Sequence, residues 1–369
     1  MASASPDELA LGVTLPWPVY DRHGKLLLGR GVLISCQAQL DALLERGVYA
    51  SVRVGDGADT LVLSADLPVF EAAQALQRDM QRAHWQLLNR VPDTLPRVAA
   101  LADAVAALMR RDSDAMLAAL QLEIDPDNHA ARQLHAAALC VLGGRVLGLD
   151  EAGSRSLLLA GLTYDVALGP LSSVLNRQNG GMNDEQWAEV KAHPRTAHEL
   201  LVDSGVADPL WLDSVLHHHE RLDGSGYPAG LTGAAIAPST RMLAIVDIYT
   251  AMVRPRAYRG AVHAKAALRS IFLERGRAVD EGMAQAFIKE IGVFPPGTLV
   301  RLANGEVGVV RRRGENAAHP TVARLVMPGG ALASVGLQRN TSESEFAIVE
   351  TVSQEQHGAL LARAVRLWC

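Results

Sequence analysis

A long stretch, from about residue 115 to residue 292, carries apolar side chains that recur with helical spacing, and it limits the possible folds more than any other feature. Several apolar segments follow one another there, separated by polar, glycine-rich turns. One of them begins with Asn183 and has Gln186 three residues later, a pair that caps a helix start through reciprocal hydrogen bonds. Because no strand-like alternation interrupts the stretch, we predict a mainly α-helical domain.

Strand-like patterns flank this helical stretch on both sides. Residues 1–65 contain two β-prone runs around a polar turn that ends in Gly24, which is a hairpin signal. Residues 293–352 alternate like strands, and Asn304 with Gly305 forms a favourable hairpin turn. We therefore predict five parts: a small β-rich N-terminal module over 1–65, a helical connector over 66–114, the helical domain over 115–292, a C-terminal β-rich segment over 293–352 and a terminal helix over 353–369.

Composition narrows the class of protein further. Of the 369 residues, 49% are hydrophobic and 20% are charged, which is enough apolar material for a packed core and too little charge for a largely disordered chain. The net charge of -5 gives the chain no bulk basic field. We therefore expect no nucleic-acid polymer among its partners.

Targeting signals and cysteines also constrain the expected location. No stretch reaches the roughly 18 apolar residues that a membrane span requires, and the N-terminus lacks a basic segment followed by an apolar run. The three cysteines, Cys36, Cys140 and Cys369, are far apart and form neither a disulfide framework nor a CxxC metal motif. We expect a cytoplasmic protein without a membrane span.

Three consecutive histidines, His217 to His219, stand before a glycine-rich turn. A helical apolar run leads into them, and Gly224 and Gly226 then permit tight backbone turns. Adjacent residues of a helix diverge by about 100°, so two neighbouring histidines can share one metal ion only near a helix end. The turn supplies such an end, although a solvated histidine patch is the alternative interpretation of the three residues alone.

Two aspartates and one more histidine are further candidates for the same site. Asp247 lies in a helix that is apolar on all sides, so its carboxylate needs a metal ion or an arginine such as Arg254 or Arg256. Asp165 follows an apolar run, where it can also serve as a local helix cap or ion-pair partner. His193 alone is more typical of a surface or core histidine than of a ligand. Only the presence of the other candidate residues makes it a candidate ligand.

At this point the sequence resembles the HD-GYP family. The segment HHERLDGSGYPAGLTGAAI, followed by MLAIVD, is similar to the family pattern nearly residue by residue, and Gly226, Tyr227 and Pro228 are the residues that name it. The similarity extends back through His193 to the HD position, which is Tyr164-Asp165 in this chain, and covers about half of the sequence. It implies an HD-superfamily helical domain that hydrolyses cyclic di-GMP to pGpG or GMP at a centre of two or three metal ions.

The resemblance also implies residues for the site. One metal ion, commonly iron or manganese, would be bound by Asp165, His193, His218 and His219, all of which are present. Such a set of three histidines and a carboxylate also suits zinc, and can leave positions open for water and phosphate. Asp165 would also bridge to a neighbouring metal ion. From their positions in the sequence, Arg256, Lys265 and Arg221 are candidates for contacts to the substrate phosphates, with an ordinary surface charge as the alternative for each.

The second metal position departs from the family pattern. Of its expected ligands, Asp247 and the bridging Asp165 are present, but Tyr164 replaces the HD histidine and Arg132 replaces the histidine of an earlier helix. A tyrosine with an ordinary pKa near 10 is a poor ligand unless an Fe(III)-like centre lowers that pKa, and arginine cannot bind a metal ion. Arg132 can instead replace a metal charge and bind Asp247 or a substrate phosphate. Two nearby histidines, His129 and His135, are imperfect substitutes by spacing, and Leu168 stands where the family usually has a lysine.

These departures leave several functions open. The intact ligand set favours a cyclic di-GMP phosphodiesterase with one or two ions and weakened activity. The replaced ligands favour a non-catalytic cyclic di-GMP receptor, or a docking protein that binds diguanylate cyclases through its Gly226-Tyr227-Pro228 surface. Hydrolysis of another nucleotide is a third possibility. The loss of two of four ligands at one position favours impaired hydrolysis over full activity.

Overall fold

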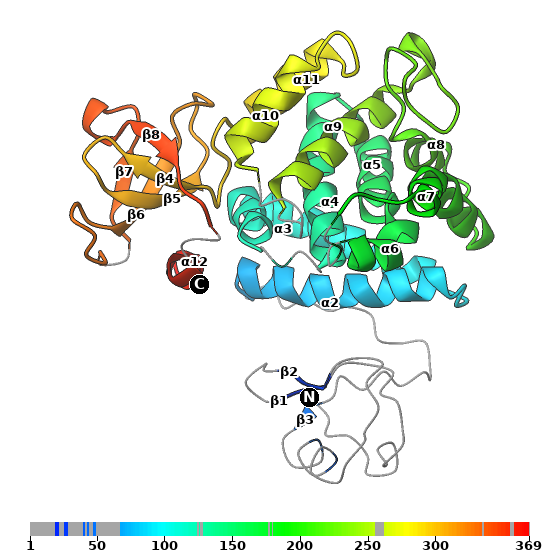
Figure 1. Cartoon of the computed structure of the whole chain (residues 1–369), viewed down its shortest axis with the longest axis horizontal. Coiled ribbons are helices and arrows are strands. Elements are labelled where there is room, and N and C mark those ends of the chain that lie inside the picture. The colour runs from blue at the N-terminus through cyan, green and yellow to red at the C-terminus, as the bar shows by residue number, and fades with distance from the viewer. Residues whose placement is uncertain are drawn as a thin grey trace. The chain divides into compact units, whose positions relative to one another are not determined.

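The computed structural model divides into two compact units, Met1–Asp59 and Thr60–Cys369 (Figure 1). It describes residues 19–21, 26–28, 40, 43, 47–48 and 67–368, the last range without 124, 126–127, 176–177, 179, 255–261, 334–335 and 355–357. In the first unit, strands β1 (Val19–Asp21), β2 (Leu26–Leu28) and β3 (Gly47–Val48) form an antiparallel sheet in the order β2-β1-β3. The pairing of β1 with β2 confirms the hairpin predicted around Gly24.

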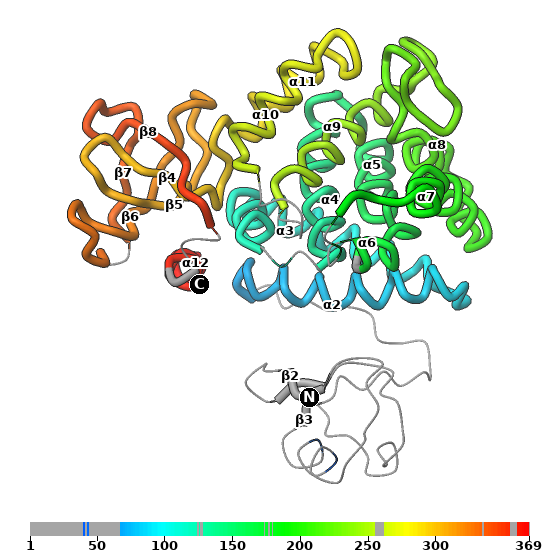
Figure 2. Tube along the Cα trace, in the orientation of Figure 1, coloured from blue at the N-terminus to red at the C-terminus, as the bar shows by residue number. Residues whose placement is uncertain are grey.

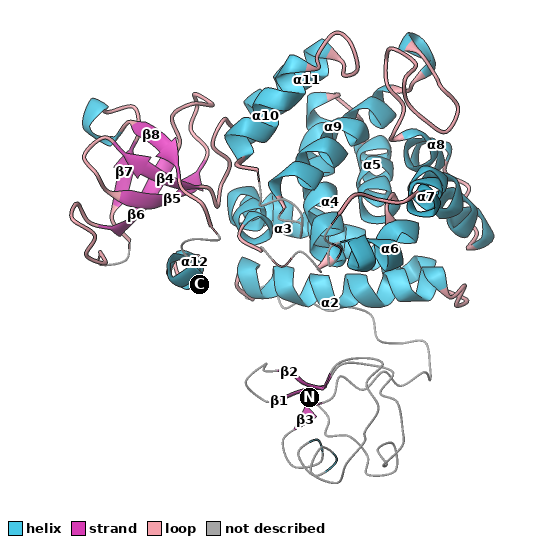
Figure 3. Ribbon diagram, viewed as in Figure 1, coloured by secondary structure: helices cyan, strands magenta, loops and turns pink. Residues whose placement is uncertain are grey.

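The second unit is mainly helical, as predicted, and ends in a small sheet (Figure 3). Its helices before the sheet are α2 (Val69–Leu88), α3 (Leu95–Gln121), α4 (His129–Val146), α5 (Glu151–Thr163), η2 (Val166–Leu168), α6 (Gly169–Leu175), α7 (Asp184–Asp203), α8 (Pro209–His217), η3 (Gly233–Ala235), α9 (Pro238–Val253), α10 (Ala264–Leu273) and α11 (Glu281–Ile291). Among the described residues, no helix is both long and apolar enough to cross a membrane.

The helix boundaries follow from capping side chains. Asn183 and Gln186 form the predicted capping box at the start of α7, because each side chain accepts a hydrogen bond from the backbone N–H of the other residue. Asp150 and Asp208 cap α5 and α8 through their carboxylates. These caps bind N–H groups that have no partner within the helix, and so fix where α5, α7 and α8 begin.

One apolar core joins α2 and α3 to the following helices. Leu76 of α2 and Leu101 of α3 are fully buried in the same cluster as Leu139 of α4 and Leu157 of α5. The helices of the predicted connector over 66–114 therefore pack onto the helical domain. The limits of the five predicted parts remain predictions.

Helices α4 and α5 lie side by side in the middle of the helical group (Figure 2). Gly161 of α5 allows this close approach, because a Cβ atom at this position would lie 2.8 Å from Cys140 Sγ and 2.9 Å from Ala137 Cα. The contact matters for the site, since α4 carries Arg132 and Asp165 follows the end of α5.

The C-terminal strands form an antiparallel sheet in the order β7-β6-β5-β4-β8. Its elements are β4 (Leu299–Leu302), β5 (Val307–Arg312), β6 (Thr321–Val326), β7 (Gln338–Asn340), η4 (Ser344–Phe346) and β8 (Ile348–Thr351), followed by α12 (Gly358–Val365). The predicted hairpin turn is confirmed between β4 and β5, where Gly305 has a φ of 86°. A positive φ there suits glycine, which has no Cβ atom to clash.

Candidate metal centre

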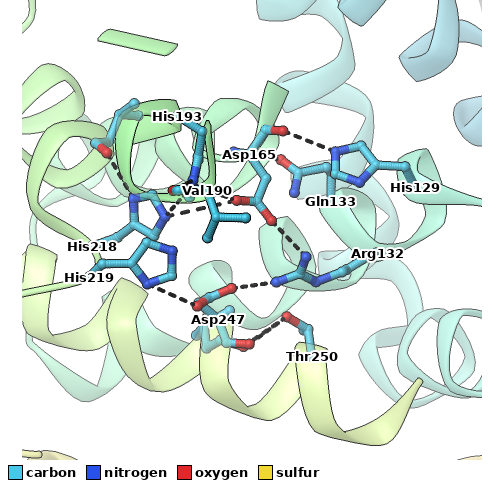
Figure 4. Close-up of polar contacts among 12 residues, drawn as sticks. His129, Arg132, Gln133, Asp165, Val190, His193, His218, His219, Asp247 and Thr250 are labelled. Atoms are coloured by element: carbon cyan, nitrogen blue, oxygen red, sulfur yellow. Dashed lines mark hydrogen bonds and ion pairs between the residues drawn. The ribbon is translucent and has the colours of Figure 1, made fainter. Parts of the chain in front are cut away.

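Four helices bring these candidate residues together (Figure 4). Asp165 follows the end of α5, His193 lies on α7, and His218 and His219 follow the last residue of α8. Asp247 faces them from α9. The two adjacent histidines therefore lie at a helix end, as the sequence predicted.

Backbone carbonyls orient two of the histidine rings. His193 Nδ1 lies 2.6 Å from the carbonyl oxygen of Val190, and His218 Nδ1 lies 2.8 Å from that of Val215. Each Nδ1 therefore faces a carbonyl oxygen, which directs Nε2 of both rings toward the site. His217 is turned away, because its Nδ1 pairs with Asp213 at 2.9 Å.

Four donor atoms, from Asp165, His193, His218 and His219, lie within 4.8 Å of one another. The Nε2 atoms of His193 and His218 lie 3.0 Å and 3.9 Å from Asp165 Oδ1. Two ligands on opposite sides of one ion are about 4.2 Å apart, since each bond is about 2.1 Å long. A small closure would therefore bring all four onto one ion, and the nitrogen and carboxylate donors fit iron, manganese or zinc.

Burial prepares these side chains for a metal ion. It lowers the pKa of His218 to about 4, with a further contribution from His193, and it lowers the pKa of His219 well below its ordinary value, helped by His218. Both rings are therefore neutral at pH 7, the form that binds metal ions. Burial alone would raise the pKa of Asp165, but the Arg132 charge and His193 hold it well below its ordinary value, so the carboxylate is ionised.

Arg132 connects the two aspartates. Its NH1 atom lies 2.7 Å from Asp165 Oδ2, and its NH2 donates to Asp247 Oδ1 at 2.5 Å. The arginine that pairs with Asp247 is thus Arg132, whereas Arg254 donates to the backbone carbonyls of Leu120 and Glu123. The guanidinium thus pairs with both buried carboxylates at once, through a hydrogen bond to Asp247 and an ion pair with Asp165.

The second departure, Tyr164, is fully buried beside the same site. Its ring stands edge-on to His218, with the ring centroids 4.9 Å apart. Burial raises the pKa of Tyr164 well above its ordinary value, and the charge of Arg132 opposes that rise only in part. The phenol is therefore neutral and a poor metal ligand. Leu168, the third departure, is half-buried in η2.

Neither imperfect substitute histidine belongs to the four-donor cluster. His129 Nε2 lies 3.1 Å from the carbonyl oxygen of Asp165, and Gln133 accepts the Asp165 N–H at 3.4 Å, so α4 holds this residue by its backbone. His135 is buried edge-on to Tyr249, with the centroids 5.8 Å apart. Burial lowers the pKa of both histidines to about 3, so they are neutral.

The segment that contains Gly226, Tyr227 and Pro228 packs on His219. The Tyr227 ring lies over the His219 ring with a centroid distance of 4.7 Å, and the Tyr227 N–H donates to the carbonyl oxygen of His219 at 3.3 Å. A Cβ atom on Gly226 would lie 2.5 Å from that oxygen, so only glycine fits there.

Glu220, a residue not predicted from the sequence to belong to the site, holds this segment in place. Its buried carboxylate accepts the N–H groups of Ala229, Gly230 and Leu231 at 2.6, 3.1 and 2.9 Å. The signal in the sequence that could have indicated this contact is the position of an acidic residue directly between the histidines and a glycine-rich turn, whose backbone N–H groups need acceptors.

Of the three residues predicted to contact phosphates, only Arg221 is shown by the structure to lie near the site. Arg221 lies close enough to His219 and Tyr227 to affect their protonation. Lys265 is exposed on α10, with its ammonium 5.2 Å from the centre of the Phe294 ring. Arg256 lies outside the described residues.

Comparison with known proteins identifies the fold and its relatives. The HD domain family matches residues 93–282. The cyclic di-GMP phosphodiesterase PA4108 of Pseudomonas aeruginosa is 32% identical over 210 residues, which are 57% of this chain and 50% of that protein. The cyclic di-GMP phosphodiesterase response regulator RpfG of Xanthomonas campestris pv. campestris is 33% identical over 146 residues, 39% of this chain and 38% of that protein.

A solved structure agrees with this assignment at the level of the fold. Bd1817, a HDG"Y"P protein from Bdellovibrio bacteriovorus, superimposes with a TM-score of 0.51 at 15% identity, covering 74% of this chain and 94% of that one. The chain spans half or less of the length of the two phosphodiesterases. This chain belongs to the HD domain family and, within it, to the HD-GYP proteins.

Proposed function

We propose that this chain is a cyclic di-GMP signalling protein whose Asp165, His193, His218 and His219 hold one divalent metal ion, and whose hydrolysis of the phosphodiester is weakened or lost. The convergence of these four donors carries the proposal. The names of the two phosphodiesterase relatives supply the nucleotide. Iron or manganese is the expected metal, and the cytoplasm is the expected location.

The bound ion would polarise a phosphoryl oxygen and lower the pKa of a water molecule. The chain itself supplies the rest of the site. His193 and His218 keep their Nε2 atoms on the site because their Nδ1 atoms face backbone carbonyls. Arg221, which lies near His219, would contribute positive charge toward a phosphate, as Lys265 and Arg256 would if the bound nucleotide reaches them.

We expect weakened hydrolysis because two ligands of the second metal position are replaced. A metal pair stabilises both the attacking and the leaving oxygen of a phosphodiester. Here Tyr164 is a neutral phenol and Arg132 is a cation, so neither replaces a histidine ligand. A single ion would have to do the work of two, and slow turnover is the expected result.

A non-catalytic role is the second candidate, and the pairing of Arg132 with both aspartates favours it. In that case the protein would bind cyclic di-GMP without hydrolysing it, or would dock diguanylate cyclases through the surface of Gly226, Tyr227 and Pro228. Their exposure is intermediate, so these residues are partly accessible to a partner.

The test compares binding with turnover on one sample. Cyclic di-GMP binding is measured by calorimetry and hydrolysis by chromatography, with manganese or iron added and after chelation. The proposal predicts metal-dependent binding together with turnover that is slow or absent. His193→Ala should abolish the metal dependence, whereas His198→Ala on the same helix should preserve it. Binding that is unaffected by chelation and by His193→Ala, or no binding at all, would contradict the proposal.

A further inference from the structure

The two buried aspartates of the site share a single cation among the described residues. Asp165 is fully buried and Asp247 is 5% exposed. Two buried carboxylates need a nearby positive charge, because removing each of them from water costs on the order of several kcal/mol. Arg132 supplies it to both, at 2.7 Å and 2.5 Å.

The geometry divides each carboxylate between two neighbours. Asp165 directs Oδ1 toward His193, at 3.0 Å, and Oδ2 toward Arg132. Asp247 directs Oδ1 toward Arg132 and Oδ2 toward His219 Nδ1, at 3.7 Å. One oxygen of Asp165 is thus available to an ion held by the histidines, while the other is taken by the guanidinium.

The position of Arg132 differs from that of an ordinary ion pair. The guanidinium lies between the aspartate of the four-donor cluster and the aspartate of α9, so a second ion bridging these carboxylates would have to occupy the same space. Arg132 cannot give up its proton to become a ligand.

We propose that the Arg132 guanidinium is the permanent second cation of this centre, so that the centre binds one metal ion and excludes another. Asp165 would then bridge a metal ion and an arginine. The inference deepens the proposed function and rests on its metal set, but it concerns the number of ions rather than the nucleotide.

The experiment counts manganese. The wild-type chain is dialysed against increasing Mn(II), bound ions are counted by elemental analysis, and electron paramagnetic resonance distinguishes isolated ions from exchange-coupled pairs. The wild type should saturate at one ion per chain with an isolated-ion spectrum. Arg132→His/Tyr164→His, which supplies two donors in place of the cation, should saturate at two ions with a coupled spectrum. Arg301→His, an exposed position on β4, should stay at one.

The outcomes separate this inference from the proposed function. Two ions in the wild type, or one ion in a double variant that unfolds at the wild-type temperature, would overturn the inference. If the double variant does not fold, Arg132→Ser replaces it, with a weaker second site expected; a single ion in that folded variant would also overturn the inference. One ion in a wild type that neither binds nor cleaves cyclic di-GMP would contradict the proposed function and leave the inference intact.

Discussion

Of the three consecutive histidines, two belong to the site and one does not. The end of α8 lies at His217, whose ring pairs with Asp213, while His218 and His219 turn into the cluster with Asp165. The helix end is what lets His218 and His219 share one cluster, because within a continuous helix consecutive side chains would point about 100° apart.

Replacing the second of these histidines should therefore remove the metal ion, and replacing the first should not. For His218→Ala we expect metal affinity to fall at least about 100-fold, since the loss of a direct ligand should exceed the effect of altering a supporting residue. His217→Ala is the matched control, with near wild-type affinity. Competition with a metal-binding dye measures both, and equal losses in the two variants would contradict this assignment.

Glu220 should act on the metal ion through His219. Glu220→Gln exchanges a carboxylate that accepts three N–H groups for an amide that accepts fewer, so the free energy of unfolding should fall by about 1–3 kcal/mol. The segment that covers His219 would loosen, and metal affinity should fall about 10-fold or more. Thermal unfolding and dye competition measure the two effects. Asp223→Asn, an exposed position in the same loop, should change neither by a comparable amount, and unchanged affinity in Glu220→Gln would exclude this role.

At the residue scale, the sequence predicted which side chains would meet but not all their partners. The spacing around the histidines and the buried acid on α9 indicated His218, His219 and Asp247 correctly as neighbours. The pairing of Arg132 with Asp165 as well depends on the packing of α4 against α5, which no local pattern contains. Glu220 was missed because its partners are backbone N–H groups of the following turn, so that only its place between the histidines and that turn indicates the contact.

At the scale of helices, the contact between α4 and α5 positions the site. Asp165 follows α5 and is held by Gln133 and His129 of α4, so a shift between these helices would move the carboxylate relative to Arg132. Gly161 sets the distance between them.

Gly161→Ala should therefore force the two helices apart. Its methyl group would lie within 3 Å of Cys140 and Ala137, and such overpacking typically costs about 1–3 kcal/mol of stability. Gly282→Ala, in an exposed first turn of α11, should be neutral or slightly stabilising because alanine favours helices. Urea unfolding compares the two. A Gly161→Ala variant as stable as wild type would show that the helices are not so closely constrained.

The elements themselves were largely readable from sequence. Helical periodicity, the Asn183 cap and the turn at Gly305 rest on local chemistry, and all three are confirmed. The attachment of α2 to the core was not predicted, because its apolar face is equally consistent with a connector.

At the scale of the second unit, ion pairs attach the C-terminal sheet to α3. Arg313, directly after β5, donates to Asp114 at 2.6 Å, to Ser113 at 2.7 Å and to the Glu290 carbonyl at 2.9 Å. Helix α3 is interrupted at Asp112, which pairs with Arg312 at 2.5 Å.

Arg313→Ala should destabilise this unit by about 2–4 kcal/mol, because it removes the hydrogen-bonded cation of the largely buried Asp114 and leaves only Arg312, at 3.9 Å. Arg301→Ala, which breaks a surface pair with Glu350, should cost less than about 1 kcal/mol. Chemical unfolding of both variants measures the difference, and hydrogen exchange in β5 should rise only in the first. Similar small effects in both would mean that the sheet is held by apolar contacts instead.

The most direct test of a one-metal centre is an anomalous difference map from crystals grown with manganese or iron. We predict one peak within bonding distance of Asp165, His193, His218 and His219, with Arg132 still between Asp165 and Asp247. Two peaks with Arg132 displaced, or a single peak away from the four donors, would contradict the account.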